Sequence, residues 1–184
     1  GCEPQALDPL NCIQLEPALL HYKSNIVGGI YTASECAIDT LKLCTSLEAI
    51  LRTRGVQFLL NNTVCQLTVR GRRVTEVLTK SDSIDADFFV LACGSSSASL
   101  ARSVNVSLPI YPIKGYSVTF DLAETNVLSE NLAPHVNVTD TSRKIVFARL
   151  GHRLRVAGMA EIVGYDASID SSAIAKLIAA THHL

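Results

Sequence analysis

The sequence has no tryptophan and one methionine, and aromatic residues make up only 5% of it. Charge of either sign is not in excess, since 16 lysines and arginines face 17 aspartates and glutamates, for a net charge of −1. Binding to nucleic acid needs clustered positive charge, and the short basic cluster at Arg70, Arg72 and Arg73 is typical of a solvated hairpin turn. We therefore expect no nucleic-acid partner. No apolar run approaches the roughly 20 residues that a membrane span requires.

Several motifs with known chemistry are also missing. None of the six cysteines forms a Cys-x-x-Cys pair, and the histidines share no spacing with acidic residues, so we predict no metal site. The sequence has no P-loop, no Gly-x-Ser-x-Gly elbow and no Gly-x-Gly-x-x-Gly turn. Cys65 and Cys93 stand in apolar runs, and we expect both to be reduced, buried thiols of a cytoplasmic protein.

Apolar residues are plentiful, making up 48% of the 184 residues, which is enough for a folded core. The pattern of the sequence changes near residue 105 and predicts two lobes, 1–105 and 106–184. Helices and strands mix in the first lobe, whereas successive strands followed by one helix fill the second. We therefore predict an α+β fold in which a mixed sheet is combined with helices.

In the first lobe, apolar residues at three- and four-residue spacing predict a helix over 36–54 with a buried stripe. Ser34 or Thr32 is expected to cap its start, and Gly55 to end it in the left-handed conformation. A strand hairpin over 56–79 follows. Its predicted strands are 56–60, 64–69 and 74–79, with a glycine turn at 70–73, and a further strand over 87–92 leads into a helix over 95–104.

The second lobe reads as an antiparallel meander. Its strands are predicted over 111–122, 136–140, 144–150 and 154–158, with a polar connection over 123–134. A helix over 167–180 is expected to begin at Ser168 or Asp170.

Two stretches carry most of the functional information. The apolar run Phe88–Ala92 is followed by Cys93, Gly94 and a serine cluster, a pattern typical of a buried strand that feeds a tight turn and a helix. Open α/β sheets bind nucleotides just beyond the carboxyl ends of such strands. The second stretch is Pro112-Ile113-Lys114-Gly115-Tyr116-Ser117, which opens another strand.

These stretches, with several shorter ones, resemble the flavin-dependent D-amino acid dehydrogenase and oxidase family. The Pro-x-Lys-Gly-Tyr-Ser run and the Arg-Leu-Gly…Gly-Met-Ala-Glu-Ile run are the specific ones. The shorter matches occur in family order. They are Glu16-Pro17-Ala18-Leu19, Gly28-Gly29-Ile30-Tyr31, Gly55-Val56-Gln57-Phe58, Asn62-Thr63-Val64 and Ala92-Cys93-Gly94-Ser95.

The resemblance implies a fragment of a two-domain FAD-dependent oxidoreductase. Residues 1–105 would belong to its FAD-binding lobe and 106–184 to its antiparallel substrate-binding lobe. The family carries its glycine-rich FAD turn upstream of the matching region, and a carboxylate-binding arginine downstream of it. We therefore expect the isolated chain to be inactive and to hold FAD weakly or not at all.

The resemblance also implies the site residues, although no catalytic residue follows from it. Four of the implied site residues could instead have a purely structural role. Val64 could be a core residue, Cys93 a buried thiol, Lys114 a solvated lysine and Tyr116 a packed ring. A carboxylate clamp formed by Arg149, Arg153 and Arg155 is less favoured than a solvated hairpin edge. The expected cofactor-binding residues are Val64, Ala92, Cys93, Gly94, Lys114 and Gly115, and Tyr116 is the expected substrate-binding residue.

For the activity, the resemblance implies oxidation of a D-amino acid to an imino acid by hydride transfer to FAD. The imino acid would then hydrolyse to a keto acid. One alternative is a related amine oxidoreductase that acts on sarcosine or glycine, and another is a non-catalytic binding or scaffold module. The parent protein is expected to be cytoplasmic, with a peripheral place on the inner membrane and a quinone acceptor as further options; the oligomeric state is left open.

Overall fold

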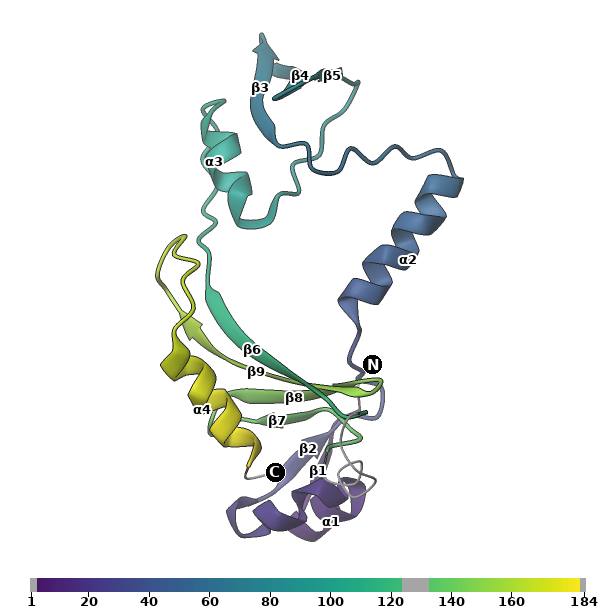
Figure 1. Ribbon diagram of the computed structural model, residues 1–184, viewed down its shortest axis with the longest axis vertical. Helices are drawn as coiled ribbons and strands as arrows, with labels where there is room; N and C mark the ends of the chain where they lie inside the picture. The colour runs from purple at the N-terminus through teal and green to yellow at the C-terminus, as the bar shows by residue number, and fades with distance from the viewer. Residues whose placement is uncertain (1–2, 124–132, 183–184) are drawn as a thin grey trace. The chain divides into compact units, whose positions relative to one another are not determined.

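The computed structural model describes residues 3–123 and 133–182 (Figure 1). Its contacts group Gly1–Cys44 with Ile113–Leu184 in one unit and place Thr45–Pro112 in another. The first unit thus draws on both ends of the sequence. The assignment of 1–105 and 106–184 to functional lobes stays a prediction.

The first unit is built on an antiparallel sheet of four strands in the order β6-β9-β8-β7. Strands β7, β8 and β9 pair in sequence order through short turns, whereas β6 pairs with β9. Alternating apolar residues give each strand one face to bury. The four predicted strands are present with their bounds shifted by a few residues, but the predicted meander holds only for the last three, because β6 lies beside β9 and not beside β7. The strands are β6 (Lys114–Asp121), β7 (Val138–Asp140), β8 (Ile145–Leu150) and β9 (Arg153–Glu161).

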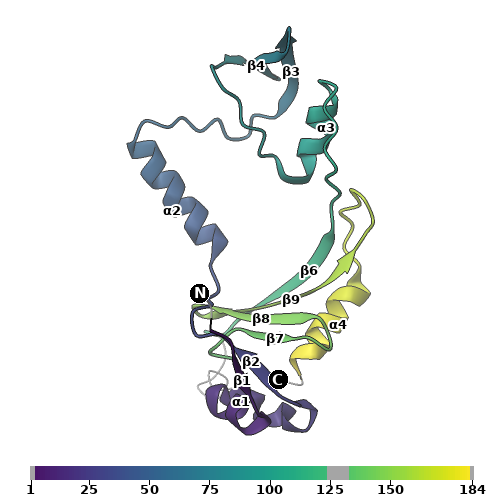
Figure 2. The same cartoon turned by 180° about the vertical axis from the view of Figure 1, so that it is seen from behind.

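Helix α4 (Ser171–Thr181) covers one face of this sheet (Figures 1 and 2). Asp170 caps the helix, since its carboxylate accepts a hydrogen bond of 2.8 Å from the backbone N–H of Ser172, which settles the choice between the two predicted caps. Val156 and Leu177 are fully buried between sheet and helix. The core of this unit comprises Tyr116, Leu122, Ala133, Ile145, Phe147, Leu154, Val156, Ala173, Leu177 and Ala180.

Near β7, the N-terminal segment adds a two-stranded sheet and two short helices (Figure 2). Asp8 accepts a hydrogen bond of 2.8 Å from the backbone N–H of Asn11, and Pro9 starts the first helix where its missing N–H costs nothing. The elements are β1 (Gln5–Leu7), α1 (Pro9–Leu15), the 3₁₀ helix η1 (Pro17–Asn25) and β2 (Gly29–Tyr31).

The second unit holds a small antiparallel sheet in the order β3-β4-β5. The predicted hairpin turn is confirmed, with Gly71 in the left-handed conformation at a φ of 64°. The sheet is followed by a short helical segment. The elements are β3 (Val64–Arg70), β4 (Arg73–Thr79), β5 (Ser83–Asp85), the 3₁₀ helix η2 (Gly94–Ser96) and α3 (Ser97–Arg102).

Helix α2 (Thr40–Thr53) crosses the boundary between the units and is shorter than predicted. It begins beside Asp39 rather than near Thr32 or Ser34, because the Asp39 carboxylate accepts a hydrogen bond from the backbone N–H of Lys42 at 3.1 Å. Its predicted end is confirmed: Gly55 has a φ of 84°, and the backbone N–H of Val56 bonds back to Leu51.

The expected burial of the α2 stripe is wrong. No residue of α2 is buried, and the apolar residues along it, such as Leu41 at 68% and Ile50 at 50%, are exposed. Periodicity shows that a helix has an apolar face but not which segment covers it.

The strands predicted over 56–60 and 87–92 are also absent from the described structure. Both segments run without regular hydrogen-bonded partners, and Phe88 and Val90 are 86% and 89% exposed. A strand needs a neighbour for its backbone groups, and an apolar run does not supply one. Cys93, just after the unpaired run, and Cys65, within β3, are exposed and not buried as expected. Cys12 is the buried thiol of the five described cysteines, all of which are free.

The predicted connection over 123–134 lies largely at 124–132, outside the described residues. Within the described part of the chain, no helix combines the length and apolar character needed to cross a bilayer.

Glu16 fastens the N-terminal segment to the main sheet. Its side chain is 1% exposed, and one carboxylate oxygen accepts hydrogen bonds from the backbone N–H groups of His135 at 2.6 Å and Val136 at 2.9 Å. The other oxygen accepts from the N–H of Ala18 at 3.0 Å. The carboxylate thus joins segments that are 119 residues apart in the sequence.

Replacing Glu16 with alanine is expected to destabilise the protein by about 2–4 kcal/mol, because three backbone donors lose their acceptor. Glu16→Gln should lose less, since the amide keeps one acceptor oxygen. Urea unfolding of the purified protein measures both changes, with the exposed Glu35→Ala as the control. Equal stability of Glu16→Ala and the control would show that the contact is not a fastening point.

Candidate functional site

The motif around Gly115 begins β6, where it meets the end of β9 at a β-bulge. The residues before and after Gly115 pair with Glu161 and Gly158, so Gly115 alone faces two residues of β9. One of those two, Met159, has a φ of 65°, in a region that residues other than glycine rarely adopt. Bulges and strained backbone concentrate at functional sites, and the start of β6 is therefore the candidate site.

Polar groups gather around Lys114 on one side of this bulge. The ammonium nitrogen of Lys114 lies 3.1 Å from Oε2 of Glu161 and 3.9 Å from Oδ2 of Asp166, and it donates to the backbone oxygen of Ser168 at 3.1 Å. The Tyr116 hydroxyl donates to the same Glu161 oxygen at 3.1 Å. We call these five residues the Lys114 clamp.

The clamp keeps Lys114 charged. Its pKa is raised chiefly by a hydrogen bond with the Tyr116 hydroxyl, which outweighs the desolvation that lowers it; the hydrogen bond and charge of Glu161 raise it further. The pKa of Asp166 is lowered, first by the backbone N–H and hydroxyl of Ser168 and also by the Lys114 charge. The Lys114 ammonium and the Asp166 carboxylate therefore hold opposite charges at neutral pH.

The clamp and Gly115 lie on opposite faces of the sheet. Tyr116 is 7% exposed and belongs to the core beneath α4, and Lys114, two residues away, shares its face. Gly115 is exposed on the other face, where it has no side chain to keep a ligand from the backbone. The ring of Tyr116 is packed in the core, which agrees with the structural alternative. The contact of Tyr116 with substrate stays a prediction.

The three arginines considered as a carboxylate clamp do not converge. Arg155 donates to the Ser117 hydroxyl at 2.9 Å, Arg153 binds Asp39 at 2.8 Å, and Arg149 donates to the backbone oxygen of the turn that follows β8. Each guanidinium has a separate partner, located before α2, on β6 or in the hairpin turn, so the three do not form a carboxylate clamp.

The other predicted cofactor residues lie in the second unit. Val64 begins β3 and is half-buried opposite Thr79. Ala92, Cys93 and Gly94 are exposed in the segment that leads into η2, and the backbone N–H of Cys93 is bonded to the Ser97 hydroxyl at 3.0 Å. Gly94 has a φ of 55° and open space where a Cβ would stand, so the backbone there is accessible. Their contact with a cofactor stays a prediction.

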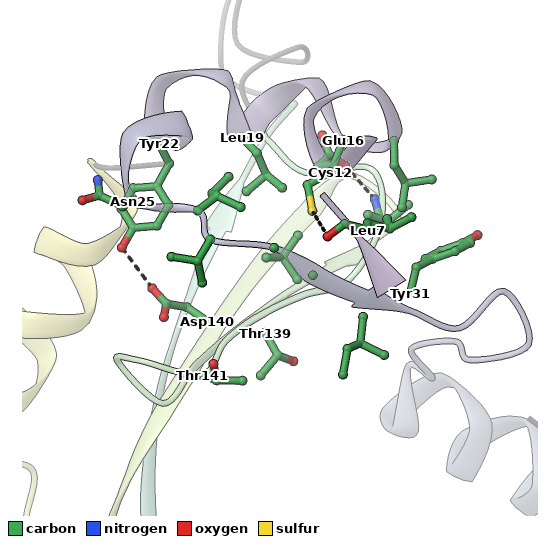
Figure 3. Close-up of a pocket in the computed structure, with 18 of the residues that line it drawn as sticks. Leu7, Cys12, Glu16, Leu19, Tyr22, Asn25, Tyr31, Thr139, Asp140 and Thr141 are labelled. Atoms are coloured by element: carbon green, nitrogen blue, oxygen red, sulfur yellow. Dashed lines mark hydrogen bonds between the residues drawn. The ribbon is translucent and has the colours of Figure 1, made fainter. Parts of the chain in front are cut away.

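A cavity of about 270 Å³ lies between the N-terminal segment and the turn that links β7 to β8 (Figure 3). Tyr22 and Asp140 both line it, with the Tyr22 hydroxyl 3.5 Å from the Asp140 carboxylate. The Arg143 guanidinium stacks over the Tyr22 ring, 4.8 Å from the ring centroid. Sequence reasoning missed this cavity, because Tyr22 and Asp140 are 118 residues apart. The local signal was the Asp-Thr-Ser turn at 140–142, a typical side-chain-capped turn.

Asp140 is held in its charged form by that turn. Burial raises its pKa, but hydrogen bonds from the Ser142 hydroxyl and from the backbone N–H groups of Arg143 and Ser142 outweigh burial, with help from the Arg143 charge. The net pKa is lower than the ordinary value. Among the residues that the structure describes, no cluster of His, Cys, Asp or Glu could hold a metal ion.

A family model described as "FAD dependent oxidoreductase" matches residues 1–184. The chain belongs to this family. It is 38% identical over 189 aligned residues to the D-amino acid dehydrogenase of Dechloromonas aromatica, covering 100% of the chain and 44% of that protein. It is 40% identical over 185 residues to D-amino acid dehydrogenase 2 of Ralstonia nicotianae, covering 100% of the chain and 43% of that protein.

The fold of this family member also occurs in solved structures of other proteins. Glycine oxidase from Geobacillus kaustophilus matches with a TM-score of 0.82 at 20% identity, over 100% of the chain and 47% of that structure. L-proline dehydrogenase from P. horikoshii matches with a TM-score of 0.81 at 14% identity, over 97% of the chain and 47% of that structure. The chain thus spans less than half the length of the relatives that it matches.

Each unit of this FAD-dependent oxidoreductase chain contains an exposed glycine whose backbone fits the close approach of a flat cofactor. Gly94 and Gly115 leave backbone open to a flat ligand, which a side chain at either position would restrict. The sequence itself contains no Gly-x-Gly-x-x-Gly turn to hold the pyrophosphate.

The two glycines at the bulge should respond differently to alanine. A Cβ at Gly158 would stand 2.8 Å from the backbone oxygen of Lys144, so Gly158→Ala is expected to cost about 1–3 kcal/mol. A Cβ at Gly115 would stand 3.6 Å from the Met159 oxygen, an ordinary contact, and Gly115→Ala should leave stability nearly unchanged. Thermal unfolding of both variants tests this, and equal losses would contradict it.

Asp140 should contribute to acid sensitivity. Because its pKa is lower in the folded than in the unfolded protein, ionised Asp140 stabilises the fold at pH above its unfolded pKa, and this contribution is lost as the pH falls through the folded pKa. In Asp140→Asn, the decrease in melting temperature between about pH 6 and about pH 3 should therefore be shallower than in the wild type. Glu35→Gln is the exposed control, and an unchanged slope in Asp140→Asn would refute the assignment.

Proposed function

We propose that the protein to which this chain belongs oxidises a D-amino acid with FAD as its cofactor. The observation that carries the proposal is the similarity of the chain, along its full length, to proteins named D-amino acid dehydrogenase, at 38% and 40% identity. The structure supports it through the Lys-Gly-Tyr bulge, which exposes bare backbone where the resemblance expects the cofactor.

FAD, when bound, would accept the hydride from the substrate α-carbon. The residues of this chain would contribute position rather than redox chemistry. In the first unit, the bare backbone of Gly115 would allow close approach of the cofactor. In the second unit, the backbone of Gly94 would do the same, and the start of β3 at Val64 would lie at the adenine end. The imino acid released from the site would hydrolyse in water to a keto acid and ammonia.

Two further features of the proposal rest on the resemblance alone. The protein would be cytoplasmic, and it would pass its electrons to a quinone at the inner membrane as a peripheral protein. Reduction of a quinone in membrane vesicles by substrate-reduced protein is the assay for this second feature. Failure of that assay together with rapid reduction of oxygen would make the protein an oxidase instead.

The test of the main proposal uses the full-length protein with an artificial electron acceptor. D-alanine is expected to bleach the flavin absorbance and to support turnover, with L-alanine as the matched control at least about a hundredfold slower, because substrate must be oriented against the flavin. Sarcosine and glycine test the amine oxidoreductase alternative. Faster turnover of sarcosine or glycine than of D-alanine would favour that alternative. If none of these substrates reduced the flavin, the non-catalytic binding or scaffold module would be the remaining interpretation.

A further inference from the structure

Within the described residues, the groups in contact with the Lys114 ammonium either neutralise its charge or accept its hydrogen bonds. Glu161 and Asp166 bring two negative charges, at 3.1 and 3.9 Å, and the Ser168 backbone oxygen accepts a hydrogen bond at 3.1 Å. The Tyr116 ring lies 5.5 Å from the same nitrogen. A lysine held in this way presents little net positive charge to any other molecule.

Lys114 and Glu161 also stand at the point where the register of the sheet changes. They pair directly across β6 and β9, and the next regular pair is Tyr116 with Gly158. The Lys114–Glu161 ion pair therefore joins the two strands on one side of the bulge. The Tyr116 hydroxyl reaches the same Glu161 oxygen, which ties both sides of the bulge to one carboxylate. The strained φ of 65° at Met159 is held between these two pairs.

Lys114 further connects the bulge to the segment that precedes α4. Asp166 and Ser168 belong to that segment, and the Asp166 carboxylate is fixed by the backbone N–H of Ser168 at 2.9 Å and by its hydroxyl at 3.0 Å. The Lys114 ammonium thus links this segment to the start of β6. Removal of that group would take away one contact that the segment and the bulge share.

We propose that Lys114 and Glu161 are positioning residues, which hold the bulge so that the backbone of Gly115 is presented on the opposite face of the sheet. Neither side chain touches the flavin. The inference rests on the proposed function, because the group presented to Gly115 is the flavin or its amino acid substrate. It departs from the expectation that Lys114 itself binds the cofactor.

The two roles predict opposite patterns in the midpoint potential of the flavin in the full-length protein. If Lys114 acted directly, Lys114→Met would lower the potential and Glu161→Gln, which unmasks the lysine, would raise it. If both residues act by position, the two variants shift the potential in the same direction or leave it unchanged. They also raise the KM for D-alanine alike, by at least about tenfold, and the double variant adds little to either single one.

Lys176→Met is the matched control, since it removes an exposed lysine of α4 outside the clamp, and it should change neither quantity. Lys114→Arg keeps the ion pair and should restore KM to within about threefold of the wild type, which a role in folding alone would not require. Opposite shifts of the potential in Lys114→Met and Glu161→Gln, or additive effects of the two on KM, would overturn the proposal.

A second measurement does not depend on turnover. Hydrogen–deuterium exchange of residues 158–170 in the full-length protein should rise alike in Lys114→Met and Glu161→Gln, and stay unchanged in Lys176→Met. Unchanged exchange in the first two variants would overturn the clamp even in a protein that turns over normally. Conversely, raised exchange in a protein whose flavin no amino acid reduces would keep the clamp and remove the proposed function.

Discussion

The antiparallel pairing of β6 with β9 is the contact on which the rest of the first unit depends. It pairs residues 114–121 with residues 153–161, and the fully buried Val156 lies within this pairing. The inward residues of both strands supply the surface on which α4 packs. A sheet buried on one face by a single helix needs this register, because a shift of one residue would turn every core side chain towards solvent. The bulge at Gly115 changes the register once, at the end of the pairing, and the core beyond it is untouched.

Local patterns in the sequence predicted the four strands of the main sheet and the turn of the hairpin. Alternation predicted the four strands, Gly71 predicted the turn, and Gly55 predicted where α2 ends, since each depends on neighbours in the chain. The exposed face of α2 and the unpaired runs at 56–60 and 87–92 could not be foreseen, because periodicity and apolar character do not say which segment lies opposite. The matched relatives are more than twice as long as this chain, as coverage of 43% and 44% implies, so their sequences contain further segments for such faces.

The candidate site divides in the same way. The Lys-Gly-Tyr motif was visible in the sequence, but the partners of Lys114 were not, since Glu161 lies 45 residues beyond Tyr116 and meets it only through the pairing of β6 with β9. Nor could the sequence show that Tyr116 turns into the core while Gly115 faces away from it. The Glu16 carboxylate and the Tyr22–Asp140 contact depend on still longer separations, of 119 and 118 residues. A site that is formed by residues far apart in the sequence can be described only when the tertiary contacts between them are known.

A family whose chemistry is supplied by a cofactor needs from its protein mainly a rigid, correctly shaped surface. The clamp, the bulge and the helix-backed sheet provide that rigidity from residues that face away from the exposed Gly115. The measurement that tests this account most directly is a crystal structure of the full-length protein with FAD and a substrate analogue. The account predicts that the Gly115 backbone contacts the flavin or the analogue while the Lys114 ammonium stays on Glu161. A Lys114 ammonium within hydrogen-bond distance of the flavin ring would contradict it.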